Sequence, residues 1–401
     1  MKLSQKAKNA VFIGTLCSFS YFAVYIARNI LSAVTPQMVA GGYSEEYIGR
    51  ISAVYFVFYA VGQLINGMIG DKIKAKWMIS VGLFGAGVTN LLFLRTTVYQ
   101  GLSVFVYGLT GFLLSMIYGP MTRVVAENTE PNHAMRCSLG YTFASFFGTP
   151  VAGLLATFLV WQSVFAVGSG ALMVMALVVF SFFTAFERRG IVRYGTCNKK
   201  EKGTGNIAVL FKHDIVKFSL ISILTGVVRT SVVFWLPTYI AQYLGFSTKQ
   251  SAGIFTGASL AISMASFVAV FVYERLGNDM NKTILLMFGL SAVFFGVTYV
   301  VKQPTVNIVA LVLAILASDA ASAIMWSRYC PGLRDTGMVS SVTGYLDFLS
   351  YMAAAAANYI FAGAVTSIGW GNLILVWLGL MVFGTVISLP YGRIKARFVK
   401  K

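Results

Sequence analysis

Charged residues are scarce in this 401-residue chain. They make up 11% of it, while hydrophobic residues make up 57%. Soluble globular proteins contain about 25% charged residues, so the deficit argues against an ordinary soluble domain and favours a chain surrounded by lipid. Histidine and cysteine are also rare, with two and four copies. Their spacing fits no metal site and no disulfide framework, so we expect no metal and no cofactor.

Long apolar segments recur along the whole chain. Each is long enough to cross a bilayer core of about 30 Å, and lipid leaves an isolated segment no alternative to a helix because its backbone groups must bond internally. The sequence therefore predicts an all-α integral membrane protein with twelve transmembrane helices, at about 10–36, 47–70, 76–95, 98–124, 136–159, 163–186, 214–243, 250–273, 282–301, 305–328, 338–366 and 370–391.

The formal net charge of +18 would favour nucleic-acid binding in a soluble protein, but the positions of the charges exclude it here. Of 31 Lys and Arg residues, 25 fall on one side of the predicted helices, and the opposite loops hold only Arg50, Arg95, Lys249 and Lys302. Basic residues mark the cytoplasmic side. We therefore expect a multi-pass protein of the inner or plasma membrane with both termini in the cytoplasm, and no nucleic-acid partner.

A polar segment at 187–213 divides the chain and is typical of a linker. It separates two six-helix bundles, 1–186 and 214–401. These halves resemble each other: Arg28 precedes Pro36 by eight positions in the first, and Arg229 precedes Pro237 by eight in the second. Parallel repeats of six helices are the plan of the major facilitator fold, which places the substrate between the halves near the midplane.

Four charged residues lie well inside predicted helices: Arg28, Arg229, Asp319 and Asp347. Charge at the bilayer centre is costly and usually marks a transport pathway. Two arginines at equivalent depth suit a phosphate-type dianion, because each guanidinium bonds oxygens bidentately and keeps its proton. The alternative is that each arginine pairs with an acid and only holds helices together. The acids themselves could pair with Arg229, carry a proton, or bind a substrate hydroxyl or ammonium group.

Aromatic and amide side chains accompany the first arginine. Tyr21 and Tyr25 share a helical face with Arg28, and Tyr59 and Gln63 are one turn apart on the next helix. We predict that these four side chains line the substrate cavity.

A loop motif follows the second helix. In NGMIGDKIKAK, Gly67, Asp71 and Lys72 are expected to hold the cytoplasmic ends of helices together rather than to bind substrate.

These stretches resemble the organophosphate:inorganic phosphate antiporters of the major facilitator superfamily. The resemblance rests on YFAVYIARN, VFYAVGQLINGMIGDK, YGPMTRVVAE and VVRTSVVFWLPTYI. It implies that Arg28 and Arg229 bind phosphate and that Tyr21, Tyr25 and Tyr59 line the pore. Gln63 departs from the lysine of glycerol-3-phosphate carriers, which leaves proton linkage open.

The resemblance thus implies a monomeric secondary transporter that carries a small, phosphate-containing organic anion through the lipid bilayer by alternating access, in exchange for inorganic phosphate. A proton-coupled organic-anion symporter and a transporter-like organophosphate sensor are the alternatives. Cationic substrates of a drug:proton antiporter would suit the two acids but not the two arginines. An enzyme is not expected, because nucleophile, metal and phosphate-loop motifs are missing from the sequence.

Overall fold

The computed structural model describes residues 4–70, 73–194, 211, 213–333 and 339–389, and these residues form only helices and their connections. The predicted all-α class is confirmed. Asp71 and Lys72 of the predicted loop motif lie outside the described residues, as does most of the predicted linker 187–213.

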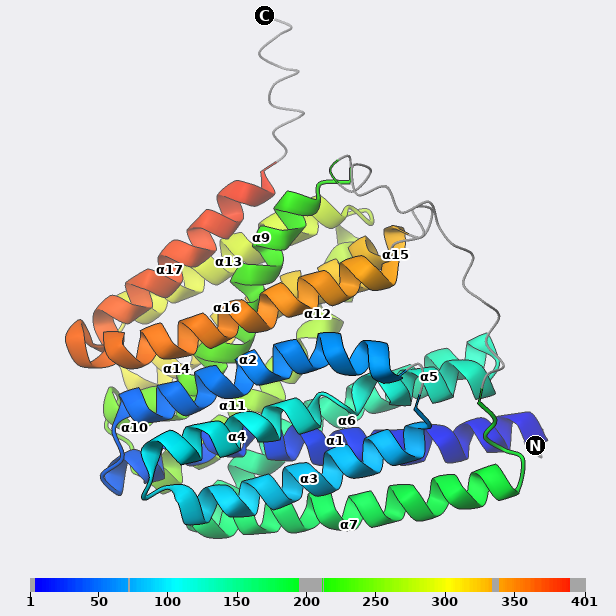
Figure 1. The fold of residues 1–401 in the computed structure, drawn as a ribbon. Helices are drawn as coiled ribbons and strands as arrows, with labels where there is room; N and C mark the ends of the chain where they lie inside the picture. Colours follow the sequence, from blue (N-terminus) through cyan, green and yellow to red (C-terminus); the bar gives the residue numbers. More distant parts are fainter. Residues whose placement is uncertain (1–3, 71–72, 195–210, 212, 334–338, 390–401) are drawn as a thin grey trace, which may run out of the picture. The chain divides into compact units, whose positions relative to one another are not determined.

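The first half of the chain contains long helices joined by short turns (Figure 1). They are α1 (Gln5–Ala40), α2 (Glu45–Gly70), α3 (Ala75–Thr96), α4 (Gln100–Leu114), α5 (Tyr118–Asn128), α6 (Pro131–Phe158) and α7 (Trp161–Arg188).

The second half is broken into more pieces. They are α9 (Ile215–Gly226), η1 (Val227–Val232), α10 (Val233–Gln242), α11 (Thr248–Ser263), α12 (Ala265–Arg275), α13 (Met280–Val300), α14 (Pro304–Ile324), η2 (Met325–Tyr329), α15 (Cys330–Gly332), α16 (Val339–Ser367) and α17 (Gly369–Ser388). The elements η1 and η2 are π-helical turns.

Each of the twelve predicted segments falls on one helix or on one continuous run of these elements. Eleven helices of the described chain are long and apolar enough to cross a membrane, and the apolar part of α6, Ala144–Phe158, accounts for the remaining one. The lengths follow from the bilayer, because about 20 residues at 1.5 Å each span the hydrocarbon core.

The described residues fall into two compact units that do not simply follow chain order. The first unit combines the N-terminal helices with segments 234–260 and 355–362. Within it α1 packs on α6 and α7, α3 packs on α7 and α4, and α2 packs on α4. The second unit holds the remaining parts of the second half, in which α13 packs on α14 and α17.

The later segments of the first unit make polar contacts with its N-terminal helices. The hydroxyl of Ser32 donates to the carbonyl of Phe234 over 2.8 Å, and the amide of Asn358 donates to Ser52 over 2.9 Å. All four residues are buried. Because buried polar groups are costly to leave unpaired, these bonds fix α10 and the middle of α16 against α1 and α2.

Candidate functional site

Arg28 lies in a box of aromatic rings. Its guanidinium carbon is 5.5 Å from the ring centroid of Tyr25 on α1, and 5.4 Å and 5.1 Å from those of Phe56 and Tyr59 on α2. Ring faces attract a cation through their quadrupole, and they do so without cancelling its charge. The box therefore helps to hold a permanently positive side chain in place.

A second layer of tyrosines surrounds the first. The ring of Tyr21 lies 5.0 Å from that of Tyr25, 5.5 Å from Tyr118 on α5 and 6.1 Å from Tyr141 on α6. Aromatic rings from α1, α5 and α6 thus pack together at one face of α1. The structure places the predicted residues Tyr25 and Tyr59 around Arg28, together with Phe56. The predicted Tyr21 packs on Tyr25, and Tyr118 and Tyr141 pack on Tyr21.

Gly148 of α6 lets α6 lie close to α1 at the residue that contributes the Tyr25 ring. A Cβ at this position would lie 2.4 Å from the Cβ of Tyr25 and 3.0 Å from the backbone nitrogen of Ile26. These atoms are far too close for any side chain larger than hydrogen. The absence of a side chain at Gly148 lets α6 press directly on the turn of α1 that carries Tyr25, one turn before Arg28.

Arg229 lies on the π-helical turn η1, in the second unit. Helix α9 and η1 run along α16, and three contacts define their register. Ser222 donates to the carbonyl of Leu346 over 2.7 Å. Further along, Gly226 faces Ser350, whose Oγ would lie 2.4 Å from an added Cβ.

The third contact shows what the π turn does. Ser231 donates to the carbonyl of Ala354 over 2.9 Å. Between the second contact and the third there are five residue steps along α9 and η1, from Gly226 to Ser231. Along α16 there are only four, from Ser350 to Ala354. The extra residue lies in the turn that carries Arg229. Such π turns are often found at functional sites, and this one carries the predicted site residue Arg229.

Each of the two arginines follows a close helix–helix contact by one turn. Tyr25, which touches Gly148, precedes Arg28 by three residues, and Gly226, which touches Ser350, precedes Arg229 by three. In each half, then, a close helix–helix contact lies one turn before the arginine. This match within each unit supports the duplication inferred from the Arg–Pro spacing.

The two acids of the second unit differ in their surroundings. Asp319 on α14 has one carboxylate oxygen, Oδ1, that is buried and has no hydrogen-bond partner among the described residues, and the charge of Arg229 acts on it. Asp347 is partly exposed on α16, one turn before Tyr351. Gln63 is partly exposed on α2.

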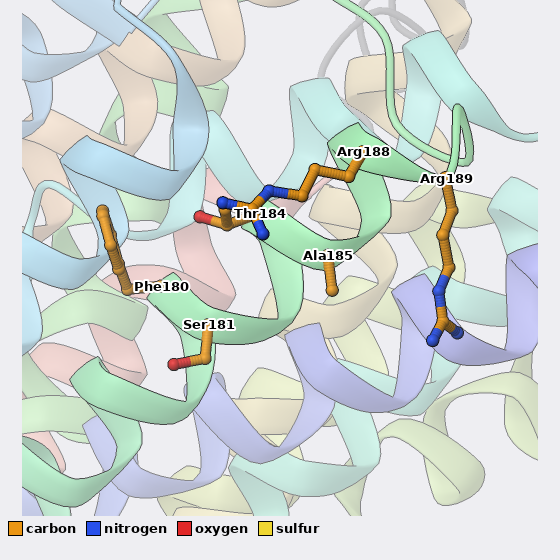
Figure 2. Close-up of a pocket in the computed structure, with 6 residues that line it drawn as sticks. All are labelled: Phe180, Ser181, Thr184, Ala185, Arg188 and Arg189. Atoms are coloured by element: carbon orange, nitrogen blue, oxygen red, sulfur yellow. The ribbon is translucent and has the colours of Figure 1, made fainter.

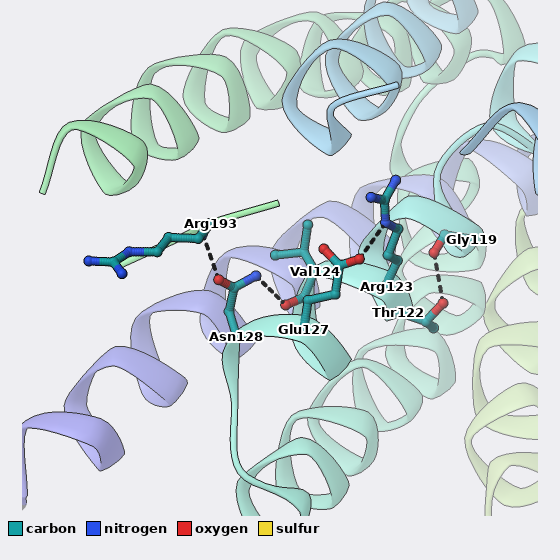
Figure 3. Close-up of polar contacts among 7 residues, drawn as sticks. All are labelled: Gly119, Thr122, Arg123, Val124, Glu127, Asn128 and Arg193. Carbon is teal, nitrogen blue, oxygen red and sulfur yellow. Dashed lines mark hydrogen bonds and ion pairs between the residues drawn. The ribbon is translucent and has the colours of Figure 1, made fainter. Parts of the chain in front are cut away.

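A polar clasp closes the end of the first unit where α5 and α7 finish (Figure 3). Arg123 donates to Glu127 one turn later over 2.8 Å, and the side chain of Asn128 accepts the backbone N–H of Arg193 over 2.6 Å. Glu127 is 5% exposed and Arg123 is 20% exposed, so this ion pair is well shielded from water.

The same end carries a second ion pair. Lys76 at the start of α3 lies 2.5 Å from Glu187 at the end of α7, and Lys74 lies 3.8 Å from it. Burial and the neighbouring Glu187 carboxylate raise the pKa of Tyr194, so its hydroxyl stays protonated beside this pair. The backbone of Gly67 is helical in α2. Sequence reasoning placed a clasp in this region but did not identify Glu127 or Glu187 as its acids.

A protein-family model described as Major Facilitator Superfamily matches residues 17–357. The chain belongs to this superfamily. It is therefore a transporter and not an enzyme, as the sequence predicted.

Similar proteins include carriers of organic phosphates. The chain is 20% identical to the glycerol-3-phosphate transporter of Bacillus subtilis over 412 residues, covering 94% of this chain and 90% of that one. It is 22% identical to the phosphoglycerate transporter protein of Salmonella typhimurium over 410 residues, covering 93% and 85%. The resemblance to the organophosphate antiporters is confirmed.

Solved structures confirm the major facilitator fold. A bacterial homologue of the lysosomal transporter Spinster, in an inward-facing and unoccupied conformation, superposes with a TM-score of 0.74 at 11% identity, covering 96% of this chain and 97% of that one. The nucleoside transporter NupG gives 0.75 at 13% identity, with 95% and 98% covered.

Proposed function

We propose that this major facilitator protein is a secondary transporter of small organic phosphates or related organic anions, working by alternating access in exchange for inorganic phosphate. The observation that carries the proposal is the pair Arg28 and Arg229, one in an aromatic box and the other on a π turn, each eight residues before a proline. The names of the similar carriers, glycerol-3-phosphate and phosphoglycerate transporters, support a phosphate group on the substrate.

The proposed exchange follows from the charge of these arginines. Two like charges that serve one substrate repel each other when the carrier closes, and a low dielectric strengthens the repulsion. A bound phosphate dianion offsets both charges and accepts bidentate bonds from each. The free energy of closing is then lower with a bound anion than without one. The carrier therefore returns only with another anion.

Contacts within the first unit are consistent with a carrier closed at one end. The segments of α10, α11 and α16 in this unit pack against α1, α2 and α6, with Gly49 close to Ala362 and Gly153 close to Thr256. We propose that both termini lie in the cytoplasm of a cell with this protein in its inner or plasma membrane. This packed end then faces away from the cytoplasm, and its contacts must break for the site to open there.

The test is phosphate exchange in proteoliposomes. Vesicles loaded with inorganic phosphate should take up external labelled phosphate through the wild-type protein, and glycerol 3-phosphate should compete. Arg28→Ala and Arg229→Ala should abolish this exchange, whereas Arg50→Ala, which removes an exposed arginine of α2, should not. Exchange by both site variants at the wild-type rate would reject the proposal. Binding without exchange by the wild-type protein would favour the organophosphate sensor.

Asp319 supports a second candidate, proton-coupled symport of an organic anion. A buried carboxylate oxygen without a hydrogen-bond partner is costly when charged, and a carboxyl group that takes up a proton from one side and releases it on the other would couple transport to a proton gradient. Asp319→Asn should then remove uptake driven by a pH gradient while leaving phosphate exchange intact. A wild-type protein whose net uptake ignores a pH gradient would exclude the symport mechanism.

A further inference from the structure

A pocket of about 420 Å³ lies at the C-terminal end of α7 (Figure 2). Its lining comes from one helix end and combines an aromatic ring, two hydroxyls and two guanidinium groups: Phe180, Ser181, Thr184, Ala185, Arg188 and Arg189. The predicted topology places this end of α7 at the cytoplasmic surface of the membrane. The anion site proposed above does not use any of these residues.

The polar groups of the pocket have unused hydrogen-bonding capacity. The Thr184 hydroxyl oxygen is buried and has no partner among the described residues. Figure 2 shows the Arg188 side chain extending back along α7 toward Thr184, and Arg189 pointing to another side of the helix end. Both arginines are exposed, and neither forms an ion pair within the described chain.

The acid that precedes these arginines does not neutralise them. Glu187 is 17% exposed and lies 2.5 Å from Lys76, with Lys74 at 3.8 Å. The negative charge of Glu187 is therefore offset by these two lysines. The pocket keeps its positive charge and favours an anion.

One stripe of α7 runs from the pocket into the membrane. Val174, Leu177, Ser181, Thr184 and Arg188 follow one another at intervals of three and four residues, which places them along one helical face. Val174 and Leu177 are 62% and 64% exposed within a strongly apolar transmembrane helix, so they face lipid. From Leu177 to Arg188 the helix rises about 16 Å. The stripe passes from apolar, through hydroxyl, to cationic side chains, in the same order as the parts of a phospholipid.

An exposed tryptophan marks the membrane surface at this point. Trp77 near the start of α3 is 51% exposed, and its ring lies 4.8 Å from that of Phe180 in the pocket. Tryptophan concentrates at the level of lipid headgroups because its ring is apolar and its N–H is polar. The pocket therefore opens at headgroup depth.

We propose that this pocket binds the headgroup of an anionic phospholipid. The phosphodiester accepts charge-assisted hydrogen bonds from Arg188 and Arg189 and a hydrogen bond from Thr184, and an acyl chain lies along Leu177 and Val174. Inorganic phosphate shares the headgroup chemistry but has no part that fits the apolar stripe. Basic pockets at the cytoplasmic side of transmembrane helices bind anionic headgroups in this way.

Native mass spectrometry of the purified full-length protein tests the proposal by titration with phosphatidylglycerol and, separately, phosphatidylcholine. Wild-type protein should bind phosphatidylglycerol in preference to phosphatidylcholine, and the Arg188→Gln/Arg189→Gln double variant should lose affinity about tenfold or more, because hydrogen bonds to charged groups are strong. Arg136→Gln is the matched control: it removes an exposed arginine predicted to lie on the same side. An equal loss in the control would show general surface charge and overturn the site.

Two further arms separate the lipid from soluble phosphate and allow for a misfolded double variant. Leu177→Gln should weaken phosphatidylglycerol binding, because the chain contact is lost, while thermal unfolding of the detergent-solubilised protein stays unchanged. Inorganic phosphate and glycerol 3-phosphate should not displace the lipid. Displacement by either, together with unaltered lipid binding in Leu177→Gln, would overturn the proposal in favour of a soluble ligand.

Discussion

A methyl group at Gly148 would have no room between α6 and α1. In Gly148→Ala the new Cβ would begin 2.4 Å from the Cβ of Tyr25, 2.9 Å from its carbonyl carbon and 3.0 Å from the nitrogen of Ile26. Two of these atoms are backbone and the third is fixed to it, so no side-chain rotation relieves the clash. The helices themselves must move apart.

The size of that movement sets the expected effect. Carbon atoms pack best at about 3.5–4.0 Å, so the two helices must separate locally by about 1 to 1.5 Å. Overpacking of this kind costs about 1–3 kcal/mol. Arg28 lies one turn from the clash and its guanidinium is held by the Tyr25 ring at 5.5 Å. If this strain destabilises the ligand-bound state, the affinity for a phosphate ligand falls between about fivefold and 150-fold.

The assay measures the affinity of the purified protein for inorganic phosphate and glycerol 3-phosphate, together with its thermal unfolding temperature. Gly140→Ala is the matched control on the same helix pair, because its new Cβ would meet only the side-chain oxygen of Ser18, at 2.9 Å, and no backbone atom. We expect both measurements to change in Gly148→Ala and to change little in Gly140→Ala. Equal behaviour of the two variants would refute the claim that Gly148 positions the arginine.

Two other substitutions test the clasp and the packed end of the first unit. Glu187→Gln leaves Lys76, which is 12% exposed, without its charged partner; the free energy of unfolding should fall by about 1–3 kcal/mol, and chemical or thermal denaturation that matches wild type would contradict the role of this pair. The side chain of Gln242 donates a 2.6 Å hydrogen bond to that of Glu45, so cysteines at these two positions can be joined by a short bis-maleimide. The cross-linked Glu45→Cys/Gln242→Cys variant should not exchange phosphate. Full exchange after complete cross-linking would show that this end need not open.

The fold was largely predictable because the bilayer imposes simple rules. Twelve apolar runs of sufficient length predicted twelve spans; eleven helices of the described residues are long and apolar enough to span, and the shorter apolar stretch Ala144–Phe158 lies at the remaining one. Charges inside apolar segments singled out Arg28 and Arg229 as candidate site residues, and helical spacing placed Tyr25 beside the first of them. Each of these inferences uses only one helix and its distance along the chain.

Contacts between distant helices were not predictable in the same way. Tyr118 and Tyr141 pack on Tyr21 from α5 and α6, and spacing along the chain does not connect them to Tyr21. The π turn at Val227–Val232 depends on how α9 packs against α16, since Val, Arg, Thr and Ser are ordinary helix residues. Glu187 was assigned to the linker segment, because a polar sequence does not reveal that two lysines of α3 lie beside it.

The most direct test of the proposed site is a double-mutant cycle on phosphate affinity with Arg28→Lys and Arg229→Lys. Lysine keeps the charge but loses the bidentate geometry, so each single variant should raise the dissociation constant of inorganic phosphate and of glycerol 3-phosphate by about tenfold or more. If both arginines hold one anion, the double variant should be non-additive, with a coupling energy of at least about 0.5 kcal/mol. Wild-type affinity in either single variant, or strictly additive losses, would contradict a shared phosphate site.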